Sequence, residues 1–278
     1  MNSPKYLDLL INVAGAIVVA FIVGYVGWAA MHTEVEEPCS ARYPAASRFS
    51  LQTSGGKPLS AIELQARAGL RDLGVIDNAS VVQVAGGPSP DALEVKLRKL
   101  PTAADPSAEA RNGIEFRWAP PGMGKATAAC LSYSVWLPDK FAFGEGGFLP
   151  GVFGGVSGSK SVTEGISLSP QWDQSGRLLL AASLGSRGIR RMTPSSEALL
   201  PTERWVKLEQ EIVLNEPGKE NGHARLWVDG TLSVDDPSVP LRGDADTLLT
   251  GILATVGYHR TQAAPGMLRL SPFEIAWR

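Results

Sequence analysis

The chain has 278 residues, with 26 lysines and arginines against 28 aspartates and glutamates, so its formal net charge is −2. That length is enough for one large soluble domain or two small ones with a proper hydrophobic core. A near-neutral charge argues against nucleic-acid binding, which needs a basic face for phosphate contacts.

The first feature in chain order is an apolar segment from Leu9 to Met31, which is interrupted only by Asn12. A helix of this length can cross a hydrocarbon core of roughly 30 Å. A cleaved signal peptide is the alternative, but its apolar core would span only about 7–15 residues after a positively charged start. Here the preceding residues carry Lys5 and also Asp8. We therefore predict a retained transmembrane helix at residues 9–31, after a short cytoplasmic terminus at residues 1–8.

The orientation of this span follows less directly from the charges. Lys5 favours a cytoplasmic start, whereas Arg42 and Arg48 follow the span closely, so the positive-inside count is ambiguous. Long domains are translocated largely regardless of such charges. We expect a single-pass protein of a bacterial inner membrane whose C-terminal domain is periplasmic. Cys39 and Cys130, the two cysteines, could form a disulfide there, and two unpaired thiols are the alternative.

One face of the apolar segment carries Asn12, Ala16, Ala20 and Gly24, which recur every four residues. Small residues let a second helix approach closely, and an asparagine can hydrogen-bond across the contact. This stripe predicts packing against an integral membrane protein. Ordinary membrane composition, in which glycine and alanine are common, is the other interpretation.

Residues 32–74 are predicted to be a linker with one short amphipathic helix between Leu59 and Leu73. From residue 75 to 278 the sequence alternates short apolar–polar runs with Gly, Pro, Asp and Asn, as "ALEVKLRKL" illustrates. Asp229-Gly230 separates two such runs and predicts a two-residue hairpin. The fold class is therefore all-β, an antiparallel β-sandwich of jelly-roll type preceded by one transmembrane helix.

Two segments carry a family resemblance. "LSYSVWLPDKFAFGEGGFLPGVFGG" (131–155) and "ERWVKLEQEIVLNEPGKENGHARLWVDG" (203–230) are similar to the alginate- and glucuronan-cleaving polysaccharide lyases of family fourteen and their relatives. The resemblance covers about residues 75–278 and implies a jelly roll.

A lyase that acts by β-elimination needs a base, a group that neutralises the uronate carboxylate, and an acid for the leaving oxygen. The resemblance implies a lysine in GGKLPG, a Ser-x-Arg pair and a Tyr-x-Tyr pair in these roles. The corresponding positions here hold Phe148, Ser169 (with Ser167 at the serine position), Ala181 and Ser183. The resemblance thus implies a lyase fold whose catalytic residues are lost.

Other candidate sites are weaker. Three histidines, His32, His223 and His259, lie far apart in sequence, so neither a metal site nor a cofactor is predicted. A possible glycan or partner contact consists of Tyr258, Arg260, Trp172 and Phe148, with His259 as a possible acid or base. Ordinary packing and surface roles are the alternative for all of them.

These observations favour a non-catalytic, membrane-anchored jelly roll that acts as an accessory or scaffold subunit of an inner-membrane complex, for example a photosynthetic, respiratory or export complex. Its expected partners are integral membrane proteins, with a polysaccharide as a second kind of partner, and not nucleic acid. The alternatives are a periplasmic module that binds a uronate polysaccharide and an active polysaccharide lyase with a relocated site.

Overall fold

The computed structural model describes residues 4–31, 37, 39–69, 72–98, 112–156, 165–194, 198–259 and 265–278. The chain divides into two compact units, Met1–Glu37 and Pro38–Arg278. The first unit contains the helix α1 (Pro4–Met31), whose side chains are described at residues 12–25, 27 and 28. Within the described residues, no helix reaches the length and apolar character that a membrane crossing requires. The predicted span is therefore not confirmed by the structure.

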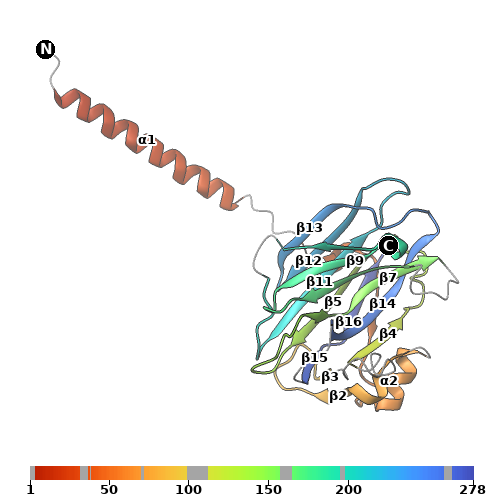
Figure 1. Cartoon of the computed structure of the whole chain (residues 1–278). Helices are drawn as coiled ribbons and strands as arrows, with labels where there is room; N and C mark the ends of the chain where they lie inside the picture. The colour runs from red at the N-terminus through yellow and green to blue at the C-terminus, as the bar shows by residue number, and fades with distance from the viewer. Residues whose placement is uncertain are drawn as a thin grey trace. The chain divides into compact units, whose positions relative to one another are not determined.

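The second unit is an antiparallel sandwich of two sheets (Figure 1). In the larger sheet the order is β13-β12-β11-β5-β15-β3-β2, and β16 joins β5 to β1. Its strands are β1 (Ala45–Phe49), β2 (Ala79–Gln83), β3 (Asp91–Leu97), β5 (Ala128–Trp136), β11 (Trp205–Val213), β12 (Gly222–Val228), β13 (Thr231–Val239), β15 (Gly266–Leu270) and β16 (Phe273–Trp277).

The smaller sheet has the order β10-β9-β8-β6-β14-β4, and β7 also pairs with β14 and β8. Its strands are β4 (Ile114–Trp118), β6 (Gly147–Phe148), β7 (Gly151–Val156), β8 (Ile166–Trp172), β9 (Leu178–Ser183), β10 (Ile189–Met192) and β14 (Thr247–Tyr258). Every strand pairing among the described residues is antiparallel. The predicted antiparallel β-sandwich is confirmed.

The predicted linker over residues 32–74 differs from the structure. The sandwich already includes the short helix η1 (Cys39–Arg42), and β1 pairs along its whole length with the C-terminal strand β16. Phe49 is fully buried and packs against Phe116 and Phe273. Because β1 carries a single large apolar side chain and its partner strand is more than 200 residues away in sequence, local periodicity could not identify it.

The short amphipathic helix predicted between Leu59 and Leu73 is present as α2 (Ala61–Ala68), and α3 (Val75–Asn78) follows it. Ser60 caps α2 through a capping box with Glu63, which satisfies the first free amides of the helix. Leu64 and Ala68 are buried, and α2 packs beside β2 and β4 (Figure 1).

The hairpin at Asp229-Gly230 has the predicted geometry. Both residues have positive φ, 48° and 79°, and Val228 pairs with Thr231 across the turn. A two-residue turn with two positive φ angles twists in the same sense as its strands. The hairpin therefore joins β12 to β13 as expected.

The outer face of the larger sheet is covered by the segment 39–43. Cys39 and Cys130 form a disulfide with a Cα–Cα distance of 5.6 Å, so the bridge that the sequence allowed is present. Both cysteines are buried and pack with Trp227. Among the described residues, these cysteines and Glu209 form the one group that could hold a metal ion, and its two sulfur atoms are bonded to each other. We call this surface the covered face.

Candidate functional site

The outer surface of the smaller sheet, which we call the open face, is the candidate site. Side chains alternate between the two faces of a strand. On β8, Ile166, Leu168 and Trp172 join the hydrophobic core, so Ser167, Ser169 and Gln171 point outward. On β9, Leu178, Leu180 and Ala182 are in the core, so the odd-numbered residues point outward.

The strand register brings the four predicted family positions onto this one face. Ser169 lies opposite Ala181, and Ser167 lies opposite Ser183. Phe148, on β6, lies opposite Gln171 of the neighbouring β8. Residues that are up to 35 positions apart in sequence therefore form one patch, as an inherited site would require.

The turn that carries Phe148 is fixed by close backbone packing. At Gly147 a Cβ atom would lie 2.1 Å from the Trp172 ring, so no larger residue fits. Beneath the turn, the carbonyl oxygen of Pro150 accepts hydrogen bonds from the hydroxyl of Tyr133 at 2.9 Å and from Nε2 of Gln210 at 2.8 Å. Both donors are buried. These contacts hold the Phe148 ring at a defined place on the open face.

A groove of about 570 Å³ lies beside this patch, and we call it the Arg191 groove. Its lining consists of Glu145, Gln171, Trp172, Asp173, Leu179, Arg191 and His259. Asp173 is occupied by its own turn, because it accepts hydrogen bonds from Ser175 and from the amide of Arg177. These bonds hold the pKa of Asp173 below its ordinary value, against the opposing effect of partial burial, so this carboxylate is ionised.

Two groups in the Arg191 groove lack the partners that such groups normally have. Gln171 is 4% exposed, and its Oε1 atom accepts no hydrogen bond from any described residue. A buried polar atom without a partner is rare and destabilising, by about 1–3 kcal/mol. Arg191, on β10, is exposed and lies opposite Ala181 of β9. No carboxylate of the described residues lies within ion-pair distance of it. A ligand with a carboxylate would supply a partner to Arg191.

His259 links the groove to Phe148. The two rings meet edge to face with their centroids 4.1 Å apart. Burial lowers the pKa of His259 below its ordinary value of 6.5, and the positive charge of Arg191 lowers it further. At neutral pH the imidazole is therefore uncharged and can accept a proton.

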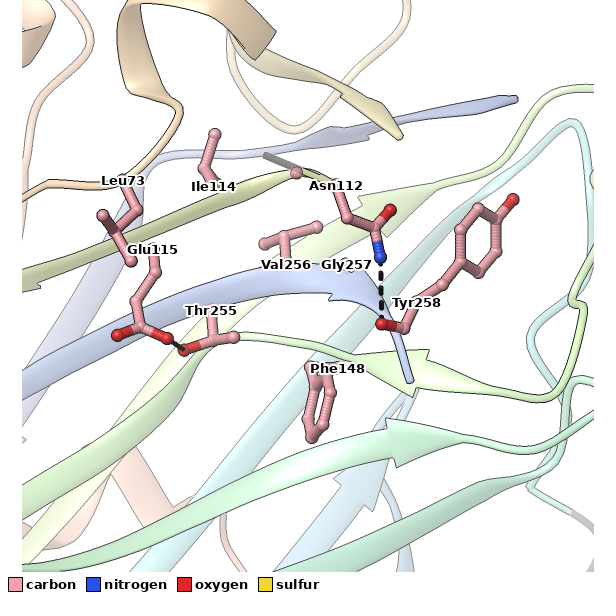
Figure 2. A pocket seen from close by; sticks show the side chains of 10 residues that line it. Leu73, Asn112, Ile114, Glu115, Phe148, Thr255, Val256, Gly257 and Tyr258 are labelled. Atoms are coloured by element: carbon pink, nitrogen blue, oxygen red, sulfur yellow. Dashed lines mark hydrogen bonds between the residues drawn. The ribbon is translucent and has the colours of Figure 1, made fainter. Parts of the chain in front are cut away.

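On the other side of Phe148 lies a smaller hollow of about 180 Å³, which we call the Glu115 pocket (Figure 2). Its lining includes Glu115, Thr255, Phe148 and Leu73, with Gly113 and Gly257 between them. The Thr255 hydroxyl donates a hydrogen bond to Oε2 of Glu115 at 3.2 Å. Figure 2 shows the Asn112 amide nitrogen turned to the carbonyl oxygen of Tyr258, at 3.0 Å.

The structure corrects two of the predicted glycan contacts. Tyr258 is 4% exposed, and its hydroxyl donates to the carbonyl oxygen of Ala142 inside the sandwich. Trp172 is 1% exposed, and its Nε1 atom donates to the carbonyl oxygen of Phe143. Both rings belong to the core, because their strands direct them inward, so neither can stack on a sugar. Arg260 lies outside the described residues.

The predicted helix stripe is exposed in this chain. Asn12, Ala16, Ala20 and Gly24 are accessible along α1, and their packing against a partner stays a prediction. Sequence reasoning missed Gln171, Arg191 and Glu115. Each lies in a short strand that carries other polar residues, and its position became informative only when the register placed it beside a groove or pocket.

Comparisons with known proteins agree with this architecture. The family model described as Polysaccharide lyase 14 matches residues 88–179. No curated protein sequence matches the chain.

Among solved structures, the chain is similar to the marine PL-14 alginate lyase of Aplysia kurodai, with 18% identity, a TM-score of 0.64, and coverage of 85% of this chain and 99% of the lyase. It is similar to an alginate lyase from Chlorella virus, with 16% identity, a TM-score of 0.64 and coverage of 84% and 99%. An endo-β-1,4-glucuronan lyase of the fungus Trichoderma reesei aligns with 9% identity, a TM-score of 0.53 and coverage of 76% and 90%. The predicted resemblance to a jelly roll of the polysaccharide lyase 14 type is confirmed.

Proposed function

We propose that the protein is a non-catalytic jelly roll, held at a membrane by its N-terminal helix, that works through contacts as an accessory or scaffold subunit of a membrane complex. The observation that carries the non-catalytic part is the chemistry of the open face. Phe148 and Ala181 cannot transfer a proton, and the hydroxyls of Ser169 and Ser183 have no adjacent base on the strands that carry them. The similar solved structures are lyases, so the non-catalytic proposal is based on the residues of this chain and not on those similarities.

The direct test is an assay for β-elimination. The unsaturated product of a uronate lyase absorbs in the ultraviolet, so full-length protein is incubated with alginate and with glucuronan. We expect no absorbance growth above a heat-treated sample. Sustained growth that is abolished by His259→Gln would instead support a lyase with a relocated site, because His259 is the neutral imidazole on this face.

The anchor is tested on the helix stripe. Leu9–Met31 is apolar apart from Asn12, and the large side chains Val18, Phe21 and Ile22 of α1 are exposed in the chain alone. If Ala20 and Gly24 contact a partner helix, Ala20→Leu with Gly24→Leu should lower the recovery of co-purified membrane protein several-fold while the chain stays in the membrane fraction. Val18→Leu with Ile22→Leu is the matched control, because these residues lie on a different side of α1. Equal recovery from both variants would mean that the stripe makes no contact.

A second candidate function, binding of a uronate polysaccharide without cleavage, is favoured by the Arg191 groove. The guanidinium of Arg191, which has no carboxylate partner among the described residues, can hold a carboxylate in a bidentate pair, and the Gln171 amide group can donate to a hydroxyl. Arg191→Ala should weaken the binding of alginate oligosaccharides about tenfold, as measured by calorimetry. Arg204→Ala, which removes an exposed arginine next to the larger sheet, is the control. Equal binding by wild type and Arg191→Ala would contradict this function.

A further inference from the structure

We propose that the Glu115 pocket binds an amino-sugar residue that carries a free ammonium group. This inference rests on the second candidate function, since it assigns a different kind of sugar to the neighbouring hollow on the same face. It is carried by the shape of the pocket, by the charge of Glu115 and by the Phe148 ring.

The pocket exists because two facing positions lack side chains. On the outer face of β14, Gly257 lies between Thr255 and His259, and it pairs with Phe148. Across the sheet, Gly113 precedes β4, and a Cβ atom there would lie 1.9 Å from the carbonyl oxygen of Val256. Backbone therefore forms the floor, and the walls are Phe148 and Leu73 on apolar sides and the Glu115–Thr255 pair on the polar side (Figure 2).

Glu115 has no cationic partner within the part of the chain that the structure describes. Its carboxylate accepts one hydrogen bond, from Thr255, and it is half-buried. The nearest arginine on the same strand face, Arg117, lies over the Phe153 ring at 5.2 Å. Among the described residues, the lining contains no lysine or arginine. A carboxylate, phosphate or sulfate would therefore be repelled there, whereas an ammonium group would form a charge-assisted hydrogen bond with Glu115.

The size of the pocket selects a ring. About 180 Å³ is below the roughly 300–1,000 Å³ of pockets that hold drug-sized ligands, so only a small group such as a single sugar ring can enter. Such a ring can place its C–H groups against Phe148 and Leu73 while its amino group reaches Glu115. Phe148 is half-buried and braced by His259, so the aromatic wall is already in place before a ligand binds.

Calorimetry with full-length protein in mild detergent tests the inference, with a glucosamine tetrasaccharide as the probe and the fully N-acetylated tetrasaccharide as its uncharged counterpart. We expect the glucosamine probe to bind at least tenfold more tightly. Glu115→Gln should reduce its affinity about tenfold and remove the preference between the two probes.

Gly257→Ala tests the shape without changing a polar group. Its Cβ atom would make an ordinary contact, 3.6 Å from Asn112, so the strand tolerates it while the floor of the pocket rises. It should weaken glucosamine binding, whereas Gly124→Ala, where nothing lies within 4 Å of the added atom, should not.

Five results would overturn the inference. Equal affinity for the acetylated probe would mean that the ammonium is not recognised, and loss of affinity in neither Glu115→Gln nor Gly257→Ala would place the probe elsewhere. Binding of tetralysine in place of the sugar would identify a pocket for a basic protein side chain. If alginate still binds in an Arg191-dependent way while the glucosamine probe does not bind, the pocket assignment fails and the uronate function stands. If neither sugar binds, both fail.

Discussion

The covered face and the open face use polar residues in opposite ways. On the covered face, Glu211 is 2% exposed and accepts a hydrogen bond from the Tyr43 hydroxyl at 2.5 Å. The guanidinium groups of Arg225 and Arg42 lie 3.1 and 3.6 Å from the same carboxylate. The neighbouring Glu209 is also buried, and it contacts Lys207 and Ser40.

On the open face, the amide oxygen of Gln171, the guanidinium of Arg191 and the carboxylate of Glu115 lack such matched partners among the described residues. Buried polar groups are normally satisfied, because an unsatisfied one costs free energy of folding. On the covered face the charged side chains are paired with one another, although the buried Nε1 atom of Trp227 has no hydrogen-bond partner among the described residues. On the open face the charged groups of Arg191 and Glu115 have no ion-pair partner among those residues, and a ligand or protein partner can supply one.

The largest effect is expected on the covered face, from the disulfide. Cys39 and Cys130 are 91 residues apart in sequence, so their bridge closes a long loop in the unfolded chain. Replacing both by serine should lower the free energy of unfolding by about 4 kcal/mol. Urea unfolding of the full-length protein, monitored by tryptophan fluorescence, measures this loss in the free energy of unfolding.

Reduction of the wild-type protein is the matched control, because it removes the bridge without changing a residue. Wild type under reducing conditions should unfold at nearly the same urea concentration as the double serine variant. A stability loss below about 1 kcal/mol would mean that the bridge adds little to the other contacts of segment 39–43.

The next effect is expected at Glu211. Glu211→Gln removes the charge that compensates Arg225 and Arg42, and it should lower the free energy of unfolding by about 2–3 kcal/mol. Ser169→Ala, on the open face, should change it by less than about 0.5 kcal/mol, because no described residue forms an ion pair or hydrogen bond with the Ser169 side chain. Comparable losses in the two variants would contradict the division between the faces.

Local sequence patterns predicted the fold well where strands are long and alternate regularly. They identified the hairpin at Asp229-Gly230 and the strand of "ALEVKLRKL", because turn chemistry and period-2 alternation act over a few residues. They missed β6, which has two residues, and β10, which has four. Strands this short are defined by their partners rather than by their own composition.

The candidate site could be predicted only in outline. The family resemblance led to four residues that the register then placed on one face. It did not lead to Gln171 or Arg191, because their importance depends on burial and on missing partners, and neither property is visible in a sequence. The predictions that Tyr258 and Trp172 contact a glycan failed for the converse reason. Strand parity, set by the pairing of β14 and β8, turns both rings into the core.

A smaller effect, of the opposite sign, is expected at Gln171. Gln171→Met keeps the approximate volume and removes an unsatisfied buried oxygen, so it should raise the free energy of unfolding by about 1 kcal/mol. Asn215 is the matched control, because its buried amide is satisfied by Glu216, Lys219 and Arg242. Asn215→Leu should lower stability in the same urea experiment. If Gln171→Met lowers stability as much as Asn215→Leu does, the Gln171 amide has a structural role and is not available to a ligand.

The smallest effect concerns the charge of His259. Burial is the main cause of its lowered pKa and Arg191 is the second, so Arg191→Gln should raise the pKa of His259 without restoring the ordinary value of 6.5.

In the unfolded chain the imidazole takes up its proton near pH 6.5, whereas in the folded chain it does so only at lower pH. Protonation therefore favours the unfolded state as the pH falls from about 6.5 through the folded pKa, and stability is lost over that range. The loss should be smaller in Arg191→Gln, because the two pKa values lie closer together. Proton NMR of the imidazole signal gives the titration midpoint of His259 in wild type and in Arg191→Gln. An unchanged midpoint for His259 would mean that the charge of Arg191 does not change the pKa of the imidazole. The two groups of the Arg191 groove would then be electrostatically independent.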